Sequence, residues 1–180
     1  MWWLLHHRRP CAVQFCDLQL LHNGYDLGAA FACKCYAAGD GAFLRAAVYM
    51  DEHGHLLTGM ATPSKASSAL AAEAQALRQA MNLARNFSLS KIIFESDCAN
   101  LKQAIKSSSK IAKIDIILDD IGDLRREIPD CGFTWVPRDG NRLAHEVAKL
   151  AAVGSLNLSW CSRRPFSVNQ ILQAGASPSS

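Results

Sequence analysis

Three acidic residues, Asp40, Glu73 and Asp97, have the type and placement for metal chemistry. Asp40 lies inside the first expected strand, Glu73 borders the apolar stripe of an expected helix, and Asp97 follows a short apolar strand where a helix begins. Carboxylates that meet at one point repel unless a cation lies between them, and Mg²⁺ prefers such oxygen ligands. We therefore expect these acids to converge on a sheet and to bind a divalent ion.

Each acid also has a simpler interpretation. Asp40 followed by Gly41 is the commonest kind of hairpin dipeptide. Glu73 suits the first turn of a helix, where the helix dipole favours acidic residues. Asp97 suits the N-cap of the next helix. The local sequence around each residue leaves these alternatives open, and it is the combination of the three that favours a site.

The elements that must position these acids follow from the hydrophobic pattern. Strands are expected from 32 to 48 and from 56 to 60, then at 91–96 and 131–138. Helices are expected at 69–86, from 97 onward, at 114–124 and from 139 or 141 to 152. Strands, helix, strand, helices, strand and helix in this order predict an α/β domain, a mixed sheet with helices packed on it.

Composition sets the limits of the interpretation. The 180 residues suffice for one domain, and 49% hydrophobic with 19% charged residues excludes a disordered chain. We expect an extension at 1–31, the domain at 32–155 and a tail at 156–180. The net charge of +3 permits contact with a polyanion without predicting it. Seven cysteines without zinc spacing, no signal-peptide order and no membrane-length apolar stretch favour a soluble, intracellular protein, which we expect to be a monomer.

Four segments resemble a known family, the ribonuclease H-like domain that is abundant in plant genomes and often related to retroelements. They are DGAF, AAEAQALRQAM, IIFESDCANLKQAI and FTWVPRDGNRLAHEVAKLA. The resemblance extends to Trp160, Pro165 and Phe166 near the end of the chain. It implies a five-stranded mixed sheet flanked by helices. It also implies endonucleolytic hydrolysis of the RNA strand of an RNA–DNA hybrid, with two Mg²⁺ or Mn²⁺ ions at the scissile phosphate.

The same resemblance assigns roles to particular residues. Asp40, Glu73 and Asp97 match the first three acids of the family's four-acid set, and His145 stands where the fourth acid normally falls. A neutral imidazole supplies no negative charge, and Mg²⁺ favours oxygen over nitrogen. His145 is equally well interpreted as a helix-border residue that faces solvent.

Other departures from the family pattern keep the activity open. Only Leu44 and Arg45 separate the first two strands as the family would place them, so the hairpin is shortened or Asp40 is displaced. The third helix is acidic and cannot serve as a basic handle for a hybrid. Candidate nucleic-acid contacts are Arg138, Asn141 and Arg142. The alternatives are a weakened or inactive nucleic-acid-binding module and a decayed retroelement-derived domain.

Overall fold

The computed structural model describes residues 29–39, 42–107, 112–157 and 159–175. Its strands are β1 (Ala30–Gly39), β2 (Ala42–Met50), β3 (Leu56–Lys65), β4 (Ile93–Ser96) and β5 (Gly132–Trp135). Its helices are α1 (Ala69–Asn86), α2 (Ala99–Ser107), α3 (Asp115–Glu127), the 3-10 turn η2 (Arg138–Asn141), α4 (Arg142–Ala152) and α5 (Phe166–Gly175).

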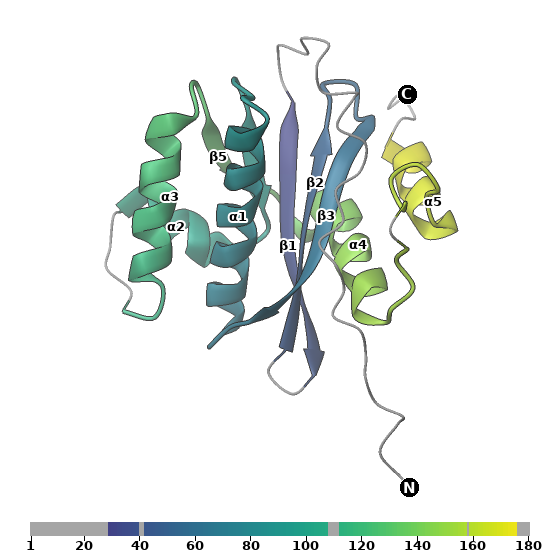
Figure 1. Cartoon of the computed structure of the whole chain (residues 1–180), viewed down its shortest axis with the longest axis horizontal. Helices are drawn as coiled ribbons and strands as arrows, with labels where there is room; N and C mark the ends of the chain where they lie inside the picture. The colour runs from purple at the N-terminus through teal and green to yellow at the C-terminus, as the bar shows by residue number, and fades with distance from the viewer. Residues whose placement is uncertain (1–28, 40–41, 108–111, 158, 176–180) are drawn as a thin grey trace, which may run out of the picture.

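The strands form one mixed sheet in the order β3-β2-β1-β4-β5. The first three strands are antiparallel neighbours, whereas β4 runs parallel to both β1 and β5. Helices α1, α2 and α3 cover one face of the sheet, and α4 and α5 cover the other (Figure 1). The predicted five-stranded mixed sheet flanked by helices is thereby confirmed.

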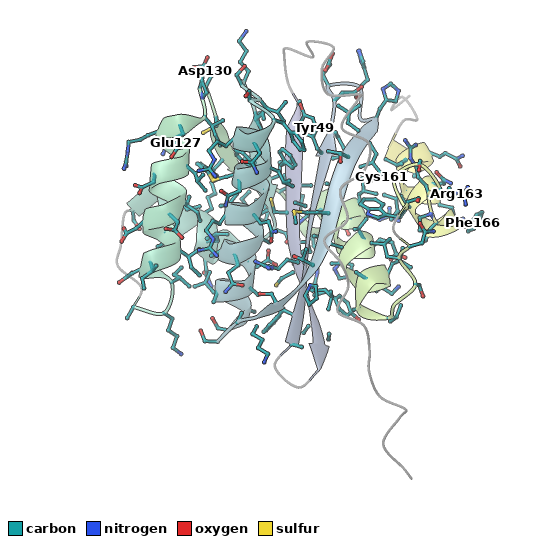
Figure 2. All side chains as sticks on the ribbon, viewed as in Figure 1. Tyr49, Glu127, Asp130, Cys161, Arg163 and Phe166 are labelled. Carbon is teal, nitrogen blue, oxygen red and sulfur yellow. The ribbon has the colours of Figure 1, made fainter. Side chains whose placement is uncertain are left out.

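The core on the α1 face combines strand aromatics with a helix of small residues. The ring of Phe31 stacks on Tyr49 at 4.7 Å and on Phe94 at 5.8 Å between centroids. Tyr49 lies between the sheet and α1 in Figure 2. The buried side of α1 is mostly alanine, which lets the helix backbone approach the sheet closely. Ser68 caps this helix by accepting a hydrogen bond from the backbone N–H of Ala71 at 3.2 Å.

The core on the opposite face includes residues from the segment that we expected to be a tail. Trp160 is fully buried, and Val168 of α5 is buried beside it. The Trp160 ring occupies the space above Gly59 so closely that an added Cβ there would lie 2.8 Å from it. None of the described helices combines the length and the apolar character that crossing a membrane requires.

One feature of the sheet determines where a site can form. The pairing of β1 with β4 begins at Ala30 opposite Ile93 and ends at Cys33 opposite Ser96. The pairing of β1 with β2 continues to Gly39. From Lys34 to Gly39, β1 therefore has none of the described strands on its β4 side, and side chains from neighbouring elements can reach it there.

Candidate functional site

Glu73 and Asp97 lie together in the structure, and the side chain of Lys34 lies between them. Its Nζ is 3.0 Å from Glu73 Oε1 and 2.8 Å from each carboxylate oxygen of Asp97. The three side chains are only 10%, 5% and 7% exposed, in the order Lys34, Glu73 and Asp97. We call these three residues the buried lysine cluster.

Three separate elements bring the cluster together. Lys34 is the first residue of β1 beyond its pairing with β4. Asp97 directly follows the last residue of β4, so its side chain is at the place where the sheet opens. Glu73 lies in the first half of α1, on the side that packs against the sheet. The site is therefore at the carboxyl end of β4, the end where α/β folds commonly place their ligands.

Neighbouring side chains hold the carboxylates in place. Asn141 is 1% exposed, and its Nδ2 donates to Asp97 Oδ1 at 3.0 Å and to the Cys33 carbonyl at 2.9 Å. It thereby ties the start of α4 both to β1 and to Asp97. The thiol of Cys35 lies 3.3 Å from Glu73 Oε1 and donates to it. The two acids are thus anchored from both faces of the sheet.

Burial and pairing act against each other on the pKa values of the cluster. Burial raises the pKa of Glu73, and the nearby Lys34 only partly offsets this. Burial acts in the same direction on Asp97, but hydrogen bonds from Lys34 and Asn141 outweigh it and its pKa is lowered. Burial would lower the pKa of Lys34, yet attraction to Glu73 and hydrogen bonds to both acids raise it. At neutral pH, Lys34 is accordingly a cation and Asp97 an anion.

These residues do not fit the divalent ions that the family resemblance implies. Three of the four carboxylate oxygens already face the Lys34 ammonium, whose positive charge repels a metal ion at the same point. In the described part of the chain, no group of three or more His, Cys, Asp or Glu side chains could hold a metal ion. The ammonium of Lys34 occupies the point between Glu73 and Asp97 where a metal ion would bind.

His145 is close enough to the cluster for charges there to act on it. Its ring lies 5.6 Å from that of Tyr36, and its Nδ1 is buried without a partner among the described residues. Burial first, and then the charges of Lys34 and Arg138, lower the pKa of His145. The imidazole is therefore neutral at neutral pH, as a metal ligand or a hydrogen-bonding group would be.

The remaining predicted residues have different surroundings. Arg138 and Arg142 are exposed on η2 and at the start of α4. Asn141 between them is buried, with its amide donated to Asp97. Asp40 lies outside the described residues. Its membership of the site stays a prediction, which the effect of Asp40→Asn on metal and hybrid binding would test.

Lys34 is the residue of this site that the sequence interpretation did not single out. A signal for it is present, because Lys34 is a charged residue in the middle of the apolar stretch from Phe31 to Tyr36. A charge within a buried strand is costly unless it has partners, so its presence indicates opposite charges nearby. The expectation that Leu44 and Arg45 form the connection between the first two strands was wrong, because both residues lie inside β2, where they pair with Tyr36 and Cys35 of β1.

Solved structures with the same fold confirm the architecture. An RNase H1 from the halophilic archaeon Halobacterium salinarum has a TM-score of 0.62 at 20% identity, covering 70% of this chain and 96% of its own. LC11-RNase H1, isolated from compost and solved with an RNA/DNA hybrid, has a TM-score of 0.64 at 18% identity, covering 72% and 100%. A foamy viral protease-reverse transcriptase with an RNA/DNA hybrid has a TM-score of 0.53 at 16% identity, covering 70% and 19%.

The sequence comparisons are consistent with these structures. No curated protein matches the chain significantly. The reverse transcriptase-like family matches residues 30–151, which is more than half of the chain and spans β1 to the last turn of α4. The chain therefore belongs to the reverse transcriptase-like family and carries an RNase H-like domain.

Proposed function

We propose that this chain binds RNA–DNA hybrids through its RNase H-like domain without cleaving them by two-metal hydrolysis. The observation that carries the proposal is the ammonium of Lys34, which lies within 3.0 Å of oxygens from both Glu73 and Asp97. A site filled in this way keeps the carboxylates ordered but offers no open coordination for the ions that the two-metal reaction needs.

The likeness to proteins that contact hybrids supports the nucleic-acid ligand. Two of the similar solved structures are described as complexes with an RNA/DNA hybrid. In this chain, Arg138 and Arg142 are exposed on either side of Asn141, whose amide contacts Asp97. Exposed arginines beside the carboxylate site are suited to contact the phosphates of a bound strand.

Metal-dependent hydrolysis of the RNA strand is the second candidate function. The observation in its favour is the convergence of Glu73 and Asp97, two acids from motif segments far apart in the sequence. For this activity, the ions would have to displace the Lys34 ammonium from both carboxylates. Mg²⁺ and Mn²⁺ are therefore tested together.

A labelled RNA–DNA hybrid separates the two candidates. At low salt, fluorescence anisotropy should show binding in EDTA that is at least as tight as in Mg²⁺, and gel analysis should show intact RNA in Mg²⁺ and in Mn²⁺. The double variant Arg138→Glu, Arg142→Glu should weaken binding by at least about tenfold, since lost phosphate contacts act through ion release. Arg163→Glu is the matched control for each single reversal, Arg138→Glu and Arg142→Glu, because it makes the same charge change at a residue exposed beside α5 at the edge of the molecule (Figure 2).

The outcomes are distinct. RNA cleavage that disappears in Asp97→Asn would establish the second candidate and refute the first. No binding to the hybrid at low salt would refute hybrid binding altogether and favour a decayed domain without a nucleic-acid role.

A further inference from the structure

We propose that Lys34 is a built-in cation that takes the place of a divalent metal ion, and that the single substitution Lys34→Asp converts the cluster into a metal site. The proposal concerns what lies between Glu73 and Asp97. It does not depend on whether the chain binds hybrids, because metal binding is measured without nucleic acid.

The geometry around Nζ is that of a cation site. An ammonium group has three N–H donors, and three carboxylate oxygens lie at 2.8 to 3.0 Å from the Lys34 nitrogen. These oxygens therefore surround one common point. Without a positive charge at that point, Glu73 and Asp97 would be two buried carboxylates that repel one another.

The position of Lys34 on β1 makes Lys34→Asp a suitable test, because the new carboxylate would point toward Glu73 and Asp97. Its backbone is held opposite Ala46 of β2, so a substitution leaves the direction of the side chain unchanged. The side chain of aspartate is two atoms shorter than that of lysine, so the substitution vacates the space between the two acids that the end of the lysine fills. A divalent ion with oxygens at about 2.1 Å is small enough for such a space.

Two oxygen atoms that could act as further metal ligands lie at the buried lysine cluster. Glu73 Oε2 and Asn141 Oδ1 are buried and have no hydrogen-bond partner in the described part of the chain. Both belong to side chains whose other polar atom already contacts the cluster. They can bind an ion directly or through its water molecules, which Mg²⁺ and Mn²⁺ usually retain. Lys34→Asp would thus combine three carboxylates with further oxygen ligands.

Mn²⁺ binding to the full chain tests the proposal. We expect titration calorimetry to show a saturable Mn²⁺ site in Lys34→Asp, and any binding by the wild type to be weaker by at least about tenfold. Mn²⁺ should raise the unfolding temperature of Lys34→Asp and leave that of the wild type unchanged, because a ligand of the folded state stabilises it. Adding Asp97→Asn to Lys34→Asp should remove the gained site.

A matched control separates a specific site from a general change in charge. Lys65→Asp changes the charge equally at an exposed position of β3, and it should bind no more Mn²⁺ than the wild type. If Lys34→Asp does not fold without metal, Lys34→Asn offers an amide oxygen without a third negative charge, and it should also gain Mn²⁺ binding.

Two results would overturn the inference. One is Mn²⁺ binding by the wild type as tight as that of Lys34→Asp. The other is the failure of both Lys34 variants to bind Mn²⁺ although circular dichroism shows that at least one is folded. Hybrid binding or its loss does not enter either result, so this proposal and the proposed function fail separately.

Discussion

Helix α1 is linked to the rest of the molecule by two kinds of ion pair. On the sheet side, Glu73 joins the buried lysine cluster, in which all three side chains are at most 10% exposed. On the outer side, α1 is linked to α3 by two pairs that we call the surface pairs, with side chains 34% to 52% exposed. These are Arg78–Asp120 at 2.6 Å and Arg85–Glu127 at 3.4 Å.

The difference between the two sets shows that distance alone does not measure the role of an ion pair. Water screens the surface pairs, and each is expected to contribute at most about 1 kcal/mol. In the buried lysine cluster, desolvation opposes the attraction, so the intact cluster is no large source of stability. Once formed, however, it is intolerant of losing one partner, because the others keep their buried charge. The buried lysine cluster therefore requires its three side chains to be in one arrangement, whereas the structure does not depend on the surface pairs in this way.

The largest expected effect is that of Lys34→Met, which keeps the aliphatic chain and removes the charge. Glu73 and Asp97 would remain buried without a cation, and we expect the free energy of unfolding to fall by about 3 to 5 kcal/mol. Urea denaturation measures it. Lys65→Met removes an exposed charge and should change stability by less than about 0.5 kcal/mol. A loss below 1 kcal/mol for Lys34→Met, on the order of a surface pair, would erase the contrast between the two sets.

The pH dependence of that effect comes next. The pKa of Lys34 is raised in the folded protein, so its contribution is complete below the ordinary lysine value of 10.5 and is lost as the pH rises through the higher folded value. The stability advantage of the wild type over Lys34→Met should therefore shrink above this pH. Paired denaturation curves measure it, and the alkaline ionisation of groups that Lys34 does not influence cancels in the difference. A constant advantage across the alkaline range would contradict a charged Lys34.

A smaller effect is expected for Asn141→Ala, which removes the amide that donates to Asp97 and to the Cys33 carbonyl. The buried acceptors would be left with fewer donors, at a cost of about 1 to 3 kcal/mol. Asn82→Ala is the comparison, since the amide of Asn82 donates to the Arg78 carbonyl within α1 itself. Equal losses in the two variants would show that Asn141 has no special part in holding Asp97.

The smallest effect is that of Arg78→Gln in a surface pair. We expect less than about 1 kcal/mol, decreasing further as salt is added. Thermal unfolding at low and at high ionic strength provides the measurement. A loss as large as that of Lys34→Met would mean that the surface pairs are as sensitive to the loss of one partner as the buried lysine cluster.

Much of this molecule could be predicted from local patterns. The period of apolar residues identified α1 and α4, and the short apolar run before Asp97 identified β4. Because Glu73 faces the sheet from a helix and Asp97 ends a strand, their convergence followed from the fold class. Lys34 did not follow, because its place depends on how far β1 continues beyond β4. Strand register depends on pairing between distant residues, which local sequence specifies weakly.

By itself, the sequence determined an α/β domain with a mixed sheet, and it placed Glu73 and Asp97 at one end of it. These properties depend on periodicity and on strand ends, which neighbouring residues determine, whereas the five strands were implied by the family resemblance. Only the tertiary structure decided what lies between the two acids. The group between them is the ammonium of Lys34, which the pairing of β1 with β2 holds in place. Two buried carboxylates without a counter-charge are costly, and Lys34 on β1 supplies that charge without a metal ion.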